Sequence, residues 1–129
     1  MIALDTNVLV RLIVRDEEVQ FKAAQALMAR HEIYLPDSVI LETAWVLRSG
    51  YGLSAKDICA AFRGVFGLEN VVLDDPHKID KVLEWHESGL DFADALHLAK
   101  SAHLPELKTF DKDFIKNARG LSECKVSGL

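Results

Sequence analysis

Short apolar runs alternate along the chain with longer stretches in which apolar residues recur at helical spacing. The runs at 2–4, 33–35 and 71–73 are typical of strands buried on both faces. Residues 107–109 predict a fourth strand, and residues 124–126 predict a weaker fifth. This alternation predicts an α/β fold, namely a three-layer α/β/α sandwich around a mostly parallel sheet of four to five strands.

Capping residues mark where the predicted helices begin and end. Apolar spacing predicts a helix over 17–30, and four further helices follow from capping signals. Asp75 followed by Pro76 is a strong start signal, an N-cap acid before a proline at the first helical position, for a helix ending near Ser88. The other three begin at Asp37 or Ser38, at Ser54 and at Asp91, and end near Ser49, Gly67 and Ala102.

The length and composition predict one domain covering residues 1–129. Half of the 129 residues are hydrophobic, and no linker-like or repetitive stretch divides them. No apolar run approaches the roughly 18 residues of a membrane span, and the N-terminus lacks the basic region of a signal peptide. Two cysteines without metal-ligand spacing indicate reduced thiols, so we expect a cytoplasmic protein with no membrane partner.

Acidic residues follow the predicted strands, where an open parallel sheet binds its ligands. Asp5 comes directly after the first strand, and Thr6 and Asn7 continue from it into a turn or helix start. Further acids follow the third strand and the fourth, which ends at Thr109. They are Asp74, Asp75, Asp111 and Asp113.

Two more acids draw attention because of their surroundings. Glu42 lies in an almost wholly apolar predicted helix, and a buried carboxylate needs a partner such as a cation or a metal. Asp94 lies near the start of a helix rich in small apolar residues, three positions after Asp91.

Each acid also has an ordinary structural explanation. Asp5 and Asp91 are suited to cap helices, and Glu42 to lie on a solvated helix face. Asp111 or Asp113 fits the start of a short helix over 112–117, while turn and capping chemistry accounts well for Asp74 and Asp75. These separate explanations do not account for the acids as a group. Asp5, Glu42, Asp94 and Asp111 come from four separate segments.

Carboxylates that converge on one point repel each other and take up protons unless a cation is present. A hard divalent ion such as Mg²⁺ resolves the repulsion, because it prefers oxygen ligands. Such an ion lowers the pKa of a bound water and neutralises phosphate charge, which suits phosphodiester hydrolysis. The four segments therefore favour a metal-dependent phosphodiesterase.

The same segments resemble those of the PIN-domain ribonucleases, and within them the VapC-type toxins of toxin–antitoxin pairs. The resemblance covers nearly the whole chain and rests on four motifs in order. They are Ile2-Ala3-Leu4-Asp5-Thr6-Asn7-Val8-Leu9, then Ser38 with Glu42, then Asp91-Phe92-Ala93-Asp94-Ala95-Leu96, and finally Thr109-Phe110-Asp111-Lys112-Asp113-Phe114. It implies cleavage of single-stranded RNA with Mg²⁺ or Mn²⁺, a homodimer, and a cognate antitoxin protein that covers the site.

The resemblance also implies roles for individual residues. Asp5, Glu42, Asp94 and Asp111 match the family's four catalytic acids. Asp91 competes with Asp94 as a metal ligand, and Asp113 competes with Asp111. The residues expected to hold the metal are Asp5, Asp91, Asp94 and Asp111, and the supporting residues are Thr6, Asn7, Ser38, Thr109 and Asp113.

Rival functions fit parts of the pattern. An aspartyl-nucleophile phosphohydrolase would use Asp5, but such enzymes carry a second Asp two residues later, where this chain has Asn7. A receiver-like module fits the length and Asp74, but two predicted helices separate its second and third strands. A PIN-like module that binds RNA without cutting it would have lost acids, and all four are present.

The net charge of −5 argues against a broadly basic nucleic-acid binder. With four acids assigned to the metal site, the remaining chain sums to −1. Basic residues that could follow an RNA backbone occur after the first motif and near the C-terminus. They are Arg11, Arg15, Lys108, Lys112, Lys116, Arg119 and Lys125. The five histidines are interpreted as packing or surface residues, and Trp45 and Trp85 as core or dimer contacts.

Overall fold

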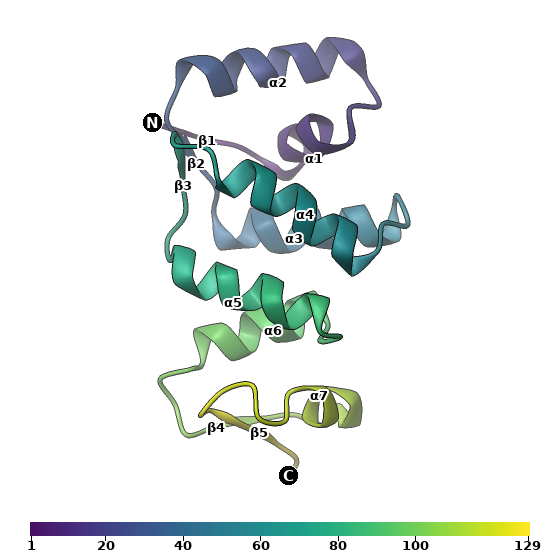
Figure 1. Ribbon diagram of the computed structural model, residues 1–129, viewed down its shortest axis with the longest axis vertical. Coiled ribbons are helices and arrows are strands. Elements are labelled where there is room, and N and C mark those ends of the chain that lie inside the picture. The colour runs from purple at the N-terminus through teal and green to yellow at the C-terminus, as the bar shows by residue number, and fades with distance from the viewer. The chain divides into compact units, whose positions relative to one another are not determined.

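The computed structural model describes all 129 residues and divides them into two compact units. The N-terminal unit is Met1–Asp74 and the C-terminal unit is Asp75–Leu129. The elements of each are labelled in Figure 1. We describe each unit by itself.

The N-terminal unit is built on three short parallel strands, β1 (Ile2–Ala3), β2 (Ile33–Tyr34) and β3 (Val71–Val72). They lie in the order β1-β2-β3, with β2 central, so Ile33 pairs with Ile2 on one side and Val71 on the other. Four helices complete the unit: α1 (Thr6–Val14), α2 (Glu18–Arg30), α3 (Asp37–Ser49) and α4 (Ala55–Phe66).

The core of the N-terminal unit lies between the strands and these helices. Helix α1 packs against both α2 and α3, and α3 also contacts α4. Burying one large aliphatic or aromatic side chain contributes roughly 1.5–3 kcal/mol. The fully buried side chains here include Leu9, Ile33, Leu35, Ile40, Leu47, Ile58 and Phe62. The apolar stripe of α1 is therefore fixed against α3, which positions the residues at the start of α1.

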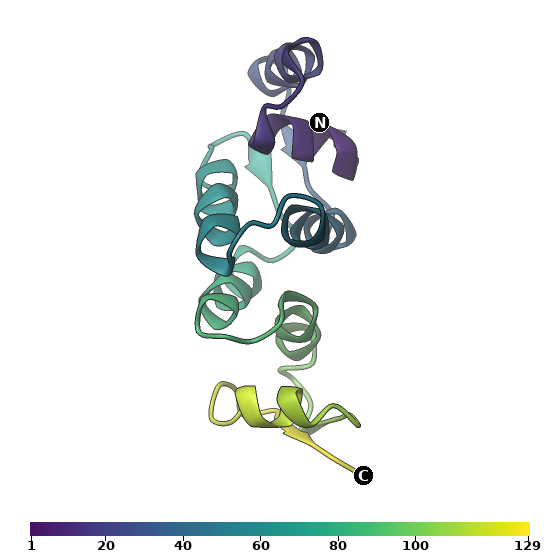
Figure 2. The same cartoon turned by 90° about the vertical axis from the view of Figure 1, so that its right-hand side faces the viewer.

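The C-terminal unit consists of a helix pair and a small parallel ladder. Helix α5 (Pro76–Glu87) packs along α6 (Phe92–Lys100), and Figure 2 shows the two next to each other, seen nearly end-on. Gly89 makes the turn between them at a φ of +117°, a conformation that favours glycine. Strand β4 (Glu106–Lys108) pairs with β5 (Lys125–Ser127), and the short helix α7 (Lys112–Asn117) connects them.

Most of the predicted elements are confirmed. The Ser54 hydroxyl accepts a hydrogen bond from the backbone N–H of Asp57 at 3.1 Å and starts α4. Asp75 caps α5 through the N–H of Lys78 at 3.2 Å, with Pro76 in the first turn. Helix α7 covers the predicted range of 112–117.

Two predicted helix ends were wrong. The N-cap of α3 is Pro36, not Asp37 or Ser38, because the Pro36 carbonyl already accepts the N–H groups of Val39 and Ile40. Helix α6 ends at Lys100, before Ala102, because the chain turns at Ser101, whose carbonyl accepts the N–H of Leu104.

The strand pairing confirms an α/β fold with parallel strands. All three strand pairs are parallel, and the five strands are arranged as a three-stranded sheet and a two-stranded sheet. Each strand has only two or three residues, so helices make up most of the regular structure. None of the helices is both long and apolar enough to cross a membrane.

Candidate active site

Asp5 lies where β1 ends and α1 begins. Its backbone is extended, and its Oδ1 accepts a hydrogen bond from the N–H of Thr6 at 2.8 Å, so it is the N-cap of α1. The side chain is exposed, and its second oxygen makes no hydrogen bond within the protein. The capping role therefore leaves one carboxylate oxygen of Asp5 available to a ligand.

Thr6 connects Asp5 to Glu42. Thr6 is 7% exposed, its backbone N–H binds Asp5, and its hydroxyl donates a short hydrogen bond to Oε1 of Glu42. Because Thr6 is in α1 and Glu42 is in α3, this bond fixes the two carboxylates across the packed helix pair.

Glu42 is exposed, so the interpretation that it is buried was wrong and the alternative of a solvated helix face is confirmed. Helix α3 turns Thr43, Ala44 and Leu47 into the core and leaves Glu42 outside. Trp45, one turn further along, is 67% exposed, so the prediction of a core position for it was also wrong, and a role as a dimer contact stays a prediction. The apolar sequence around Glu42 therefore does not mean that both sides of α3 are covered.

Asp5 and Glu42 open into the same pocket. The pocket has a volume of about 270 Å³ and mixes two carboxylates, one guanidinium and apolar walls. Its lining residues are Asp5, Thr6, Asn7, Val10, Arg11, Glu42, Val46 and Tyr51.

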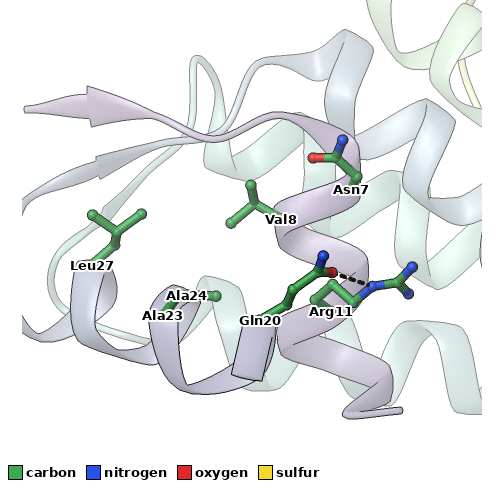
Figure 3. A pocket seen from close by; sticks show the side chains of 7 residues that line it. All are labelled: Asn7, Val8, Arg11, Gln20, Ala23, Ala24 and Leu27. Carbon is green, nitrogen blue, oxygen red and sulfur yellow. Dashed lines mark hydrogen bonds between the residues drawn. The ribbon is translucent and has the colours of Figure 1, made fainter. Parts of the chain in front are cut away.

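A second pocket of about 370 Å³ lies between α1 and α2. It is shown in Figure 3 and is lined by Asn7, Val8, Arg11, Gln20, Ala23, Ala24 and Leu27. Asn7 and Arg11 line both pockets, since they lie one helical turn apart on the same face of α1. Asn7 is exposed, so its amide is accessible from this face.

Arg11 is held by three side chains, which together with it form the Arg11 cluster (Arg11, Asp16, Gln20 and Tyr51). Its Nε donates to Gln20 at 2.8 Å, and its Nη1 donates to both Asp16 and the Tyr51 hydroxyl at 3.1 Å. The Tyr51 hydroxyl in turn donates to Asp16 at 2.8 Å. That hydrogen bond, more than the Arg11 charge, lowers the pKa of Asp16, and the pKa of Arg11 is raised by Tyr51 and then by Asp16.

The other three members of this cluster were not predicted from the sequence. Gln20 is nine positions from Arg11 along the chain and Tyr51 is forty, so no local pattern connects them. The only local signal is that Tyr51 stands between two glycines in the connection after α3.

The C-terminal unit contains a second group of acids, centred on Asp94. Asp91 is the N-cap of α6, and its Oδ1 accepts the N–H of Asp94 at 3.1 Å. Partial burial raises the pKa of Asp94, the charges of Asp91 and Asp111 raise it further, and His97 opposes them weakly. Asp91 and Asp111 thus act electrostatically on one half-buried carboxylate.

Asp111 begins α7 and is oriented by Thr109. The Thr109 hydroxyl accepts the Asp111 N–H at 3.0 Å, and the Asp111 carboxylate accepts the N–H groups of Asp113 and Phe114 at 2.9 and 3.2 Å. Asp113 is exposed in the first turn and contributes its backbone N–H to Asp111. Ser38 lies exposed in the first turn of α3, one turn before Glu42.

The candidate ligands in the N-terminal and C-terminal groups of acids are all carboxylates. Carboxylate oxygens are the ligands that a hard divalent ion prefers. No group of three or more His, Cys, Asp or Glu side chains is placed to hold a metal by itself. The N-terminal unit brings Asp5 and Glu42 to one pocket, and the C-terminal unit brings the charges of Asp91 and Asp111 to act on Asp94.

The family model of the PIN domain matches residues 2–120 of the chain. The chain belongs to the PIN domain family. The match includes every acid discussed above, from Asp5 to Asp113, so the predicted family is confirmed.

Comparison with known proteins gives one further result for this PIN domain. A search of curated proteins finds no match. Among solved structures, the chain is similar to the crystal structure of Mycobacterium tuberculosis VapC20, a toxin that cleaves the sarcin–ricin loop. The two share 21% sequence identity over 97% of this chain and 99% of that one, with a TM-score of 0.46.

Proposed function

We propose that this PIN domain is a Mg²⁺- or Mn²⁺-dependent endoribonuclease that cleaves single-stranded RNA and acts as the toxin of a VapBC-type toxin–antitoxin pair. The observation that carries the proposal is the family match, because it spans all the motif acids in one continuous range, 2–120. The pocket shared by Asp5 and Glu42 supports it, since carboxylates that open into a pocket are suited to hold an ion and a substrate.

The proposed catalytic residues are Asp5, Glu42, Asp94 and Asp111. Asp5, Asp91, Asp94 and Asp111 would hold the divalent ion, which when bound supplies an activated water and neutralises charge on the phosphate. The raised pKa of Asp94 supports this assignment, because repulsion from Asp91 and Asp111 is the kind that a cation relieves.

The supporting residues are proposed to orient these acids. Thr6 holds Glu42 through its hydroxyl and Asp5 through its N–H, and so fixes the separation of two carboxylates. Thr109 holds the backbone of Asp111. Asn7 presents an amide beside Asp5, and we assign lesser positioning roles to Ser38 and Asp113.

The proposal is tested by cleavage of a labelled single-stranded RNA with and without Mg²⁺. We expect Mg²⁺-dependent cleavage that is lost in Asp5→Asn, since the amide removes a negatively charged ligand. Asp74→Asn is the matched control, because Asp74 also follows a strand and its carboxylate accepts a hydrogen bond from the Tyr34 hydroxyl alone, at 2.8 Å. Cleavage that is unchanged by Asp5→Asn, or independent of divalent ions, would contradict the mechanism, and phosphate bound covalently to Asp5 would favour a phosphohydrolase.

The toxin role predicts two protein partners. We propose that the protein forms a homodimer and binds a cognate antitoxin. Expression should arrest growth, and co-expression of the protein encoded by the neighbouring reading frame should relieve the arrest. Growth that is unaffected by a catalytically active protein would contradict the toxin role and leave the ribonuclease proposal intact.

We also propose that residues 1–129 form a single domain whose strands belong to one sheet of four to five strands between two helical layers. The continuous family match over both units supports this. One cooperative calorimetric transition for the whole chain is expected, and two separate transitions would contradict it.

A further inference from the structure

Arg11 is the one basic side chain that lines either of the two pockets described above. It extends from the same face of α1 as Asn7 and faces the pocket that also contains Asp5 and Glu42. Its side chain is 32% exposed, so it is accessible to a ligand in solution. A guanidinium at this place calls for an explanation beyond its contacts within the protein.

The Arg11 cluster fixes the guanidinium and leaves one end of it free. A guanidinium carries five N–H groups, and three of them bind Gln20, Asp16 and Tyr51. The two N–H groups on Nη2 make no hydrogen bond within the protein. In Figure 3 the terminal nitrogens of Arg11 point away from Gln20. Arg11 is thus a pre-organised donor with two unused hydrogens.

The acids in the same pocket do not neutralise Arg11. Its ion pair is with Asp16 at 3.1 Å, and neither Asp5 nor Glu42 forms a salt bridge with it. A cation held near two carboxylates, but not paired with them, suits a ligand that is itself anionic. Under the proposed function that ligand is the RNA backbone, since phosphate oxygens accept charge-assisted hydrogen bonds from guanidinium groups.

We propose that Arg11 binds, through Nη2, a phosphate of the single-stranded RNA next to the bond that is cleaved. Asp16, Gln20 and Tyr51 are then positioning residues that hold the guanidinium in place. This inference rests on the proposed ribonuclease function and adds to it a substrate-binding residue that is not one of the motif acids.

Arg30 provides a matched control on a neighbouring helix. It lies in the last turn of α2, and its side chain is exposed. It lines neither pocket and is not among the basic residues that could follow an RNA backbone. Removing its charge changes the net charge of the protein as removal of Arg11 does, without touching the proposed phosphate contact.

The test compares Arg11→Gln with Arg30→Gln in Mg²⁺-dependent cleavage of a single-stranded RNA of mixed sequence, at several KCl concentrations. We expect KM to rise about tenfold in Arg11→Gln, the effect of losing a hydrogen bond to a charged group, while kcat changes less. The slope of log(1/KM) against log[KCl] should become shallower by about 0.7, as expected for one lost phosphate contact on a single strand. Arg30→Gln should keep the slope and KM of the wild type.

Asp16→Asn separates phosphate binding from a purely structural role. It removes the ion-pair partner and loosens the Arg11 cluster, but keeps the Arg11 charge. We expect Asp16→Asn to keep the wild-type slope of log(1/KM) against log[KCl]. If Arg11 had only a structural role, Asp16→Asn and Arg11→Gln would change this slope alike. The melting temperature of each variant is measured by circular dichroism. If Arg11→Gln does not fold, Arg11→Lys replaces it, with KM raised severalfold relative to Arg30→Lys.

The results distinguish the two proposals. If the wild type cleaves RNA but Arg11→Gln and Arg30→Gln share one KM and one salt slope, the Arg11 inference is wrong and the ribonuclease function stands. Equal KM values for Arg11→Lys and Arg30→Lys overturn it likewise. If the wild type cleaves no single-stranded RNA, the proposed function fails and the inference fails with it.

Discussion

At the scale of single residues, Thr6 is the side chain on which the N-terminal part of the site depends. Its backbone N–H binds one carboxylate and its hydroxyl binds another, while the residue itself is buried. Buried groups that orient ligands commonly change affinity or activity 10–100-fold when they are removed. The geometry of Asp5 and Glu42 therefore depends on a residue that does not itself contribute a charge.

We predict that Thr6→Val lowers RNA cleavage by roughly tenfold, because it keeps the shape of the side chain but removes the hydroxyl that holds Glu42. Thr6→Ser retains the hydroxyl and should restore most of the activity. Initial cleavage rates for the three proteins, with melting temperatures as a check on folding, test the prediction. Equal rates for Thr6→Val and the wild type would show that the Thr6 hydroxyl does not orient Glu42.

Residue patterns alone predicted part of the site. Asp5, Asp91 and Asp111 could be found because the local sequence marks the start of a helix at each of them. Each of the three is the N-cap of a helix. Whether Glu42 is exposed could not be decided from the sequence, and the Arg11 cluster could not be found in it. The first depends on which side of α3 packs inward, and the second joins residues far apart along the chain.

At the scale of elements, the capping signals were informative because the physics of a helix start is local. Ser54, Asp75 and Asp111 each accept an N–H from the first turn, and this needs only the few residues that follow. Strand partners are less predictable, since pairs such as Ile33 with Val71 involve distant segments. The two- and three-residue strands also carry too little pattern to decide how many share a sheet.

The start of α6 allows a prediction that separates capping from charge. Asp91→Asn keeps a good N-cap residue but removes one negative charge near Asp94. We expect the pKa of Asp94 to fall toward its ordinary value, as measured by NMR titration of the side-chain carboxyl carbon. An unchanged pKa would mean that the charge of Asp91 does not raise the pKa of Asp94.

The sign of the accompanying change in stability follows from linkage. The pKa of Asp94 is higher in the folded state than in the unfolded state. At pH values between these two pKa values the folded protein binds more protons, so its stability falls as the pH rises through this range. Asp91→Asn should weaken this pH dependence. Urea unfolding at a series of pH values measures it, and Asp80→Asn, an exposed acid on α5, serves as the control.

At the scale of the whole molecule, the acidic net charge of −5 is compatible with an RNA substrate. Four of the 20 acids are assigned to the proposed metal site, and the rest of the chain is close to neutral. A bound divalent ion would change the local field from one that repels phosphate to one that attracts it. Arg11 adds a fixed positive group in the same pocket as Asp5 and Glu42.

This charge distribution predicts that Mg²⁺ or Mn²⁺ stabilises the folded protein. An ion that binds only the folded state adds about 2.7 kcal/mol at a concentration 100 times its Kd, and it should raise the melting temperature above that in NaCl of equal ionic strength. Asp94→Asn should lose most of this rise, since it removes a proposed ligand, while Asp80→Asn should keep it. Asp94 would be excluded as a ligand if the melting temperature responded equally to Mg²⁺ and to NaCl. It would also be excluded if Mg²⁺ raised the melting temperatures of Asp94→Asn and the wild type equally.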